Sequence, residues 1–249
     1  SPHMAPYGGV MITCDLSRDL PALLRVLSTA DIDTVIYAAG PPGDDACRLV
    51  MPYAVTLHVD VPRVLVEEWA CPGRRLIYLS TLLDPQTSVY ARLKRMGELW
   101  MLKAPGARVL RLGSVYGGAR LNDGVVSRFI RAALESPHRV GVYGDGTQAI
   151  LLAHMSDVTS AVQRALVGPS PRVVQVFSSA VSIIGLLDQI EALTGVVFRR
   201  ELQGASTSQM LRRYVADGAI HRHITPIPLC AGLWQSIEVA RSMAGTPRG

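Results

Sequence analysis

The chain has 249 residues, of which 49% are hydrophobic and 18% are charged, so it can bury one substantial core. Its formal charge of +5 is spread over scattered arginines without a basic block, which argues against a nucleic-acid partner. No apolar run reaches the roughly 20 residues of a membrane span and no signal peptide follows Met4, so we expect a cytoplasmic protein without a membrane partner. Ser1, Pro2 and His3 resemble a cloning remnant, and we expect residues 1–8 to form a tail outside the fold.

The cysteines and histidines show no pattern typical of a metal site. The four cysteines are Cys14, Cys47, Cys71 and Cys230. None of them stands at a paired ligand spacing, so we expect reduced thiols. His221 and His223 lie in an expected loop, and two histidines at that spacing do not by themselves make a metal site. We therefore expect no bound metal.

The first half of the chain alternates apolar strands with helical stretches. Strands are expected over Gly9–Thr13, Asp33–Ala39, Arg75–Ser80 and Arg108–Leu112. Helices are expected from the leucine spacing of residues 20–27, and over Ala46–Trp69 and Ser88–Lys103. Pro62 lies inside the second of these helices, so we expect a kink or a break there. This alternation favours a parallel sheet that is covered by helices.

The regular alternation of strands and helices ends near residue 118. Helices are expected over Gly124–Leu134, Asp157–Leu166, Ile183–Leu193 and Gly232–Met243. Short strands are expected over Arg139–Tyr143 and Val173–Phe177. Asp157 is the expected N-cap of its helix. We expect residues 9–118 to form the core, and residues 119–249 to form mostly a small α/β lobe for substrate, with segments that return to the core.

The sharpest candidate for chemistry is Tyr90 with Lys94, four residues apart on an expected helix and therefore on the same side of it. A lysine one turn away is expected to lower the pKa of the phenol, which then exchanges protons more easily near neutral pH. Ser80 and Thr81 close the preceding strand, at the sheet edge where ligands of α/β proteins bind. Glu98, one turn beyond Lys94, is most simply an ion-pair partner for it. The pattern alone is weak, and an ordinary amphipathic helix with exposed Tyr90 and Lys94 stays open.

Together with this pair, the runs LIYLST, YARLK, ARVLRLGSVYG, VYGDGTQ and AHMSDV resemble the extended short-chain dehydrogenases/reductases, the epimerase/dehydratase branch. The chain is most similar to the NDP-4-ketohexose reductases and epimerases of antibiotic pathways. The resemblance implies an α/β fold, here a truncated Rossmann-like parallel sheet with helices on both faces and a small C-terminal α/β lobe. It implies catalytic positions at Tyr90, Lys94, Thr81 and Ser80. It implies cofactor-side positions at Ala39, Gly40, Gly113, Ser114 and Val115, and substrate-pocket positions at His58, Tyr116, Ile150 and His154.

The sequence departs from the family pattern in three places. The family opens with a strand, a glycine-rich turn and a helix that hold the pyrophosphate, whereas Gly8 and Gly9 stand at the start of the first expected strand here and not between a strand and a helix. We therefore expect the GxxGxxG segment and the first two strands to be absent. Ile150 and Leu151 stand at the positions where the family usually has Arg-Asp, and an aliphatic side chain cannot replace a guanidinium fork, although it can simply pack in the lobe. Thr81 and Tyr90 are also closer in sequence than in ordinary members.

The absent strands have a consequence for the sheet. We expect Gly9–Thr13 to lie beside Asp33–Ala39, joined by a right-handed crossover. The sheet edge near Gly9 would then tend to be paired or covered, so a homodimer is expected. Dimers of the family also commonly pack through the helices that correspond to Ala46–Trp69 and Ser88–Lys103.

Three functions compete. The first is an isomerase, lyase or cyclase of natural-product biosynthesis with no cofactor in the usual site. Tyr90, Lys94 and Thr81 would then supply acid–base chemistry to a small, carbonyl-bearing and fairly apolar substrate. The second is an NAD(P)-dependent nucleotide-sugar ketoreductase or epimerase. The third is a non-catalytic scaffold partner in a biosynthetic complex.

Overall fold

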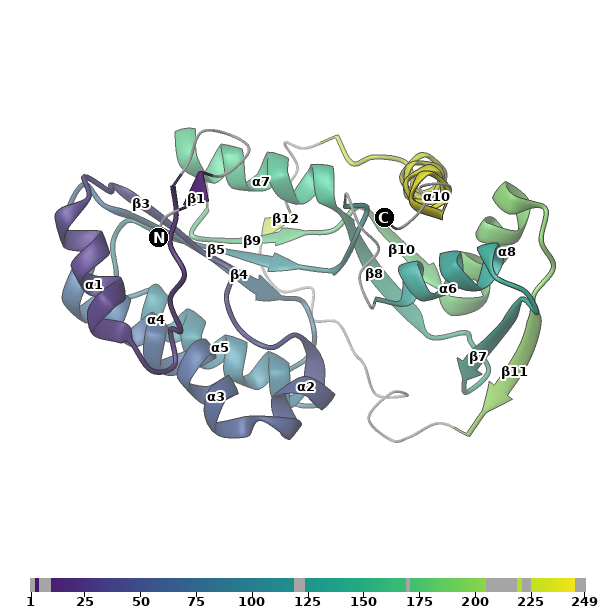
Figure 1. Ribbon diagram of the computed structural model, residues 1–249, viewed down its shortest axis with the longest axis horizontal. Coiled ribbons are helices and arrows are strands. Elements are labelled where there is room, and N and C mark those ends of the chain that lie inside the picture. Colours follow the sequence, from purple (N-terminus) through teal and green to yellow (C-terminus); the bar gives the residue numbers. More distant parts are fainter. Residues whose placement is uncertain are drawn as a thin grey trace.

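The computed structural model describes residues 3–4, 10–118, 124–168, 171–204, 219–220 and 225–244. Figure 1 shows a sheet with helices on both faces and, beside it, a lobe built from the second half of the chain. The expected α/β architecture, a Rossmann-like parallel sheet with a C-terminal lobe, is confirmed. β9 and β12, from the second half of the chain, belong to the core sheet.

The core sheet has five described strands. They are β3 (Thr34–Tyr37), β4 (Arg75–Thr81), β5 (Ala107–Leu112), β9 (Val173–Val176) and β12 (Ala219–Ile220). The spatial order is β12-β9-β5-β4-β3, and every neighbouring pair is parallel. Leu76, Ile77 and Tyr78 in β4 are buried in succession, as in a strand that is covered on both faces. The carboxyl ends of these strands therefore meet at one edge, where a ligand site is expected.

Helices cover this sheet on both sides (Figure 1). They are α1 (Leu20–Thr29), α2 (Gly43–Leu49), α3 (Met51–Val55), α4 (Val61–Val64), α5 (Val89–Met101) and α7 (Met155–Val167). α7 lies on the face opposite to α1 and α5 (Figure 1). Two π-helical turns, η1 (Thr56–Asp60) and η2 (Leu65–Trp69), flank α4 and make one continuous helix from Met51 to Trp69.

The break expected at Pro62 is wrong. Pro62 lies in the first turn of α4, and the π-helical turns on either side shift the backbone hydrogen bonds around its missing N–H. The chain bends instead at Val50, whose φ of −127° is not helical. Within the described part of the chain, no single helix is long and apolar enough to cross a membrane. One pair among the described helices, α2 and the helix after it, bent by 118°, meets the length and composition of a span.

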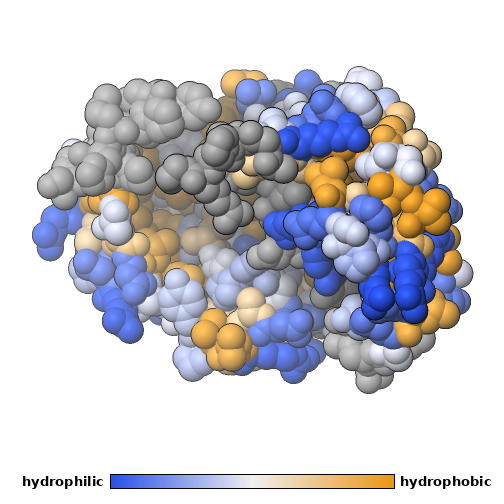
Figure 2. Space-filling view, turned by 45° about the vertical axis from the view of Figure 1, so that its right-hand side comes forward, coloured by the Kyte–Doolittle hydropathy of each residue, from blue (hydrophilic) through white to orange (hydrophobic). Residues whose placement is uncertain are grey.

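The described residues of the lobe form two small sheets and three helices. One sheet has the order β10-β8-β6, with β6 (Ser114–Tyr116), β8 (Ala149–His154) and β10 (Ser179–Ser182). The other pairs β7 (Arg139–Tyr143) with β11 (Arg199–Gln203) in parallel. The helices are α6 (Val125–Leu134), α8 (Ile183–Thr194) and α10 (Leu229–Ala244). Phe129, Ile130 and Leu186 belong to the lobe's own apolar core, and the lobe surface mixes charged with apolar side chains (Figure 2).

The expected place of the first strand is also wrong. β2 (Val10–Met11) pairs antiparallel with β1 (His3–Met4) and not with β3, which is the edge strand of the core sheet among the described residues. Antiparallel segments can be joined by a short connection, whereas a parallel place beside β3 needs a crossover. The local pairing therefore replaces the expected long-range one.

Candidate functional site

The candidate site lies where β4 ends and α5 begins. Thr81 is the last residue of β4, and its Oγ1 accepts a hydrogen bond from the Leu83 amide at 3.2 Å. Ser88 is the N-cap of α5, with its Oγ accepting from the Ala91 amide at 3.0 Å. The short connection between β4 and α5 thus brings the first turn of α5, which carries Tyr90, back to the carboxyl edge of the sheet.

Lys94 is buried, with 3% of its surface exposed. Its Nζ donates to the Leu79 carbonyl at 2.9 Å, and lies 4.8 Å from the ring centre of Tyr78 and 5.9 Å from that of Tyr90. Burial lowers the pKa of Lys94 to about 8, because it disfavours the charged form, although Cys47 and Glu98 act in the opposite direction. Lys94 is therefore a group that can gain or lose a proton close to neutral pH.

The expected fall in the pKa of Tyr90 is wrong. Burial raises the pKa of Tyr90 to about 12, and the neighbouring Cys47 adds to this rise. The reason is that desolvation of a phenolate outweighs a lysine that is itself desolvated and whose Nζ donates to the Leu79 carbonyl. At neutral pH Tyr90 is therefore a protonated phenol, a proton donor and not a base.

His58 lies beside this pair. Its ring makes an edge-to-face contact with Tyr90, with centroids 5.5 Å apart, and its Nε2 lies 3.1 Å from the Pro41 carbonyl. Burial lowers the pKa of His58 to about 4, helped by the charge of Lys94. The imidazole is neutral, so Nε2 donates to Pro41, and the buried Nδ1 has no hydrogen-bond partner among the described residues.

Ser80 and Glu98 belong to a separate buried network. The Ser80 hydroxyl donates to Glu98 at 2.5 Å, and the same carboxylate binds Arg95 at 2.9 Å and Arg111 at 2.8 Å. The expected Glu98–Lys94 ion pair is therefore not what the structure shows, because two guanidinium groups hold the carboxylate. Of the two hydroxyls at the end of β4, Ser80 is committed to this network and Thr81 is the one beside the candidate site.

The residues that the resemblance expects on the cofactor side lie at the neighbouring strand ends. Gly40 follows β3 with φ +121°, and a Cβ there would come within 2.2 Å of the His58 ring. Gly113 follows β5, and a Cβ there would come within 2.6 Å of the Leu151 carbonyl oxygen. These two positions accept only glycine, and the absence of a side chain there leaves space above the carboxyl edge of the sheet. Ala39 precedes Gly40, and Ser114 and Val115 begin β6.

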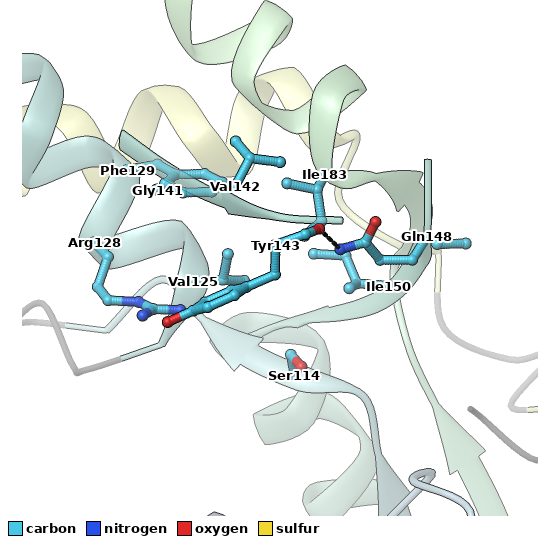
Figure 3. A pocket seen from close by; sticks show the side chains of 11 residues that line it. Ser114, Val125, Arg128, Phe129, Gly141, Val142, Tyr143, Gln148, Ile150 and Ile183 are labelled. Carbon is cyan, nitrogen blue, oxygen red and sulfur yellow. Dashed lines mark hydrogen bonds between the residues drawn. The ribbon is translucent and has the colours of Figure 1, made fainter. Parts of the chain in front are cut away.

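A cavity of about 90 Å³ opens in the lobe (Figure 3). Eleven residues line it: Ser114, Val125, Arg128, Phe129, Gly141, Val142, Tyr143, Gln148, Ala149, Ile150 and Ile183. Arg128 and Tyr143 both line the cavity, and the Gln148 amide donates to the Tyr143 carbonyl at 2.8 Å (Figure 3). Ser114, which the resemblance expects on the cofactor side, also lines this cavity.

Sequence reasoning missed Arg128, Tyr143 and Gln148. Arg128 lies on the helix expected over Gly124–Leu134, where an exposed arginine has the pattern of an ordinary solvated face. Ile150 is buried in the lobe core and lines the cavity, which is compatible with both readings of this position.

Tyr116 and His154 pack against each other and do not line that cavity. Their ring centroids are 5.1 Å apart, and His154 Nδ1 accepts from the Ser156 amide at the start of α7. His154 is therefore the cap of α7, and the expectation that Asp157 caps it is wrong. The buried Asp157 accepts from the Ser178 hydroxyl at 2.5 Å instead.

No cluster of three or more potential metal ligands occurs in the described part of the chain. His221 and His223 lie outside the described residues. The four cysteines are unpaired with one another.

A sequence model of the NAD dependent epimerase/dehydratase family matches residues 3–176. The chain belongs to this family. No curated protein matches the sequence.

Solved structures confirm the fold. MoeE5 in complex with UDP-glucose and NAD superposes with a TM-score of 0.81 at 24% identity, over 96% of this chain and 88% of MoeE5. UDP-glucose 4-epimerase from Thermotoga maritima, with UDP-glucose, gives 0.80 at 17% identity, over 96% and 87% of the two chains. TunA, an NAD dependent NDP-hexosamine 5,6-dehydratase involved in tunicamycin biosynthesis, gives 0.71 at 22% identity, over 88% and 80%.

The expectation of no NAD(P) in the usual site is wrong. The family that includes this chain is NAD dependent, and MoeE5 and the UDP-glucuronic acid 4-epimerase of Bacillus cereus were crystallised with NAD. The expectation rested on the glycine-rich segment, which serves the pyrophosphate. It gave too little weight to Gly40, Gly113 and the Tyr90–Lys94 pair, the positions that the resemblance expects at the nicotinamide end.

Proposed function

We propose that the protein is an NAD-dependent enzyme that epimerises, dehydrates or reduces a sugar nucleotide. The observation that carries this proposal is the Tyr90–Lys94 pair beside the end of β4, with Lys94 buried and its ammonium close to the Tyr90 ring. The sugar-nucleotide complexes of MoeE5 and of the Thermotoga maritima epimerase support it. The role of TunA in tunicamycin biosynthesis supports a place in natural-product biosynthesis.

The donor set at the strand ends fits the nicotinamide half of the cofactor. A phenol and an ammonium present two donors to the adjacent hydroxyls of a ribose, and Lys94 uses one of its three protons for Leu79. Tyr90 and Lys94 would hold this ribose. Around the nicotinamide ring we place Ala39, Gly40, Gly113, Ser114 and Val115. When bound, NAD supplies hydride transfer.

Tyr90 is the proton donor in this account. Its raised pKa of about 12 keeps the phenol protonated at neutral pH, so it can protonate a sugar oxygen when a sugar ketone is reduced. When a sugar hydroxyl is oxidised, its proton would leave through the Tyr90 hydroxyl to the neutral form of Lys94. The Lys94 ammonium, with a pKa of about 8, can return a proton to the phenolate that remains. Thr81 orients the same sugar oxygen through its hydroxyl proton, since its oxygen already accepts from Leu83.

The lobe cavity is the proposed place for the nucleotide end of the substrate. Tyr143 offers an aromatic face and Arg128 a guanidinium group, which suit a base and a phosphate. Because Ser114 belongs to both parts, a molecule that spans from Tyr90 to this cavity would pass over it. Any contact of His58, Tyr116 or His154 with substrate stays a prediction.

Turnover tests the proposal. UDP-glucose and dTDP-glucose are incubated with the protein and NAD, and the sugar signals are followed by NMR. We expect conversion of at least one of them, and a fall of about 100-fold or more in the Tyr90→Phe variant, the scale typical of a lost proton donor. Conversion that is equally fast in Tyr90→Phe would overturn the assignment of Tyr90. No conversion of either sugar, or of a broader set of sugar nucleotides, would overturn the function.

We also propose a homodimer through α3 and α5. Tyr53, Met96 and Leu99 are apolar side chains on these helices that stay 43%, 44% and 69% exposed. Light scattering after size exclusion tests this: we expect twice the chain mass, and a monomer for Leu99→Asp. A monomeric wild-type protein would refute it.

A further inference from the structure

A buried carboxylate outside the Tyr90–Lys94 pair holds the first turn of α5. Asp44, the second residue of α2, is 7% exposed. Its Oδ1 accepts two hydrogen bonds from the start of α5, from the Ser88 hydroxyl at 2.8 Å and from the Tyr90 amide at 2.9 Å. The two partners are more than forty positions away in sequence, so no local pattern predicts this contact.

The contact satisfies groups that a helix leaves open. The first four N–H groups of a helix have no partner inside it. Ser88 caps the Ala91 amide from the N-cap position of α5, and Asp44 caps the Tyr90 amide from another helix. The Ser88 hydroxyl also gives its proton to Asp44, which turns its acceptor side toward Ala91. The backbone of Tyr90 is therefore fixed by Asp44 and not by α5 alone.

The same residue is attached to the cofactor-side turn. Asp44 directly follows Gly43, whose φ of +80° lets the chain turn from Gly40 into α2. His58 holds this turn through the Pro41 carbonyl. Asp45, by contrast, is exposed in the same helical turn, so a general benefit of acidic residues at the start of a helix does not explain why Asp44 is buried.

We propose that Asp44 is a positioning residue, which sets the place of Tyr90 by its hydrogen bond to the Tyr90 amide and links it to the Gly40–Gly43 turn. This inference rests on the proposed role of Tyr90 as proton donor. The carboxylate acts through its acceptor oxygen and not through its charge. An asparagine, whose Oδ1 accepts in the same way, should therefore replace it.

The test compares Asp44→Ala, Asp44→Asn and the control Asp45→Ala, which removes the same charge from the adjacent exposed position. Protein labelled with ¹⁵N-tyrosine reports the exchange rate of the Tyr90 amide, assigned with Tyr90→Phe. Ring-proton NOEs between Tyr90 and His58 report where the phenol lies. In Asp44→Ala we expect at least tenfold faster exchange and loss of the NOE, whereas Asp44→Asn and Asp45→Ala keep the wild-type values. In the reaction that the wild-type protein catalyses, we expect kcat of Asp44→Ala to fall at least tenfold while its KM stays within twofold. In Asp44→Asn we expect kcat to return to the wild-type value.

Two outcomes overturn the proposal: wild-type exchange and NOE in Asp44→Ala, or an Asp44→Asn variant as impaired as Asp44→Ala. A lower melting temperature with unchanged kcat and NOE also overturns it, since the role would then be structural only. If Asp44→Ala does not fold, a scalar coupling across the hydrogen bond between the Tyr90 nitrogen and the Asp44 carboxyl carbon is measured in the wild-type protein, and its absence overturns the proposal. If no sugar nucleotide is converted, the proposed function fails, while exchange and NOE still decide on Asp44.

Discussion

Lys94 should lower the free energy of unfolding at neutral pH, and this cost should disappear at alkaline pH. Its pKa falls from 10.5 to about 8 on folding, because the buried ammonium is desolvated. A shift of this size corresponds to about 3 kcal/mol, at roughly 1.4 kcal/mol per pKa unit. Since the folded pKa is below the unfolded one, the unfolded chain binds more protons between about pH 8 and 10.5, and stability rises with pH across that window. Below pH 8 the full cost is present, because both states are charged.

The perturbation is Lys94→Met, which removes the charge and keeps much of the side-chain volume. We expect this variant to be more stable than wild type at pH 7 by up to about 3 kcal/mol, less the hydrogen bond to Leu79 at roughly 1 kcal/mol. The gap should close between pH 8 and 10.5. Urea unfolding at pH 7, 8.5 and 10 measures it. A gap that does not change with pH would refute the reasoning.

Further predictions follow from the same structure. The pKa of His58 is lowered to about 4, so the stability of the wild-type protein should fall as the pH drops from 6.5 to 4. The His58→Asn variant should lose this dependence in acid unfolding, and an acid unfolding profile equal to that of the wild type would contradict the prediction. Gly97→Ala should destabilise the protein by several kcal/mol or prevent folding, because the new Cβ would lie 2.2 Å from the His58 carbonyl oxygen. Thermal melts measure this, with Gly168→Ala as the control, since a Cβ at Gly168 meets no atom closer than 3.9 Å. Arg128→Ala should weaken UDP binding by tenfold or more in calorimetry, and equal affinity would remove Arg128 from the proposed nucleotide site.

The order of the core elements could be predicted because each one has a local cause, whereas β6, β8, β10 and β11 of the lobe were not predicted. The apolar runs gave β4 and β5 within a residue of their observed ends, and the spacing of apolar residues with Ser88 in front gave the start of α5. Gly195 ends α8 in the left-handed conformation, as its place after an apolar helix indicates. Such features depend only on neighbours in sequence, so the sequence alone is sufficient for them.

The errors concern contacts between distant residues. Whether Glu98 binds Lys94 or Arg111 depends on which strand lies beneath α5, and no helical spacing contains that information. The direction of the Tyr90 pKa depends on how deeply α5 is buried. Whether Arg128 lines a cavity depends on α6 lying beside β7 and Ile150, which come from later parts of the chain. The Tyr90–Lys94 pair could be found, whereas the groups that hold and tune it could not.

Binding of NAD tests the central claim most directly, since the proposed reaction cannot proceed without it. Isothermal titration of NAD and of NADP into the wild-type protein measures it without any substrate. We predict a Kd tighter than roughly 100 μM for one of them, about 5.5 kcal/mol, and a clear loss of affinity in Lys94→Met. No binding of either nucleotide at millimolar concentration would contradict the account.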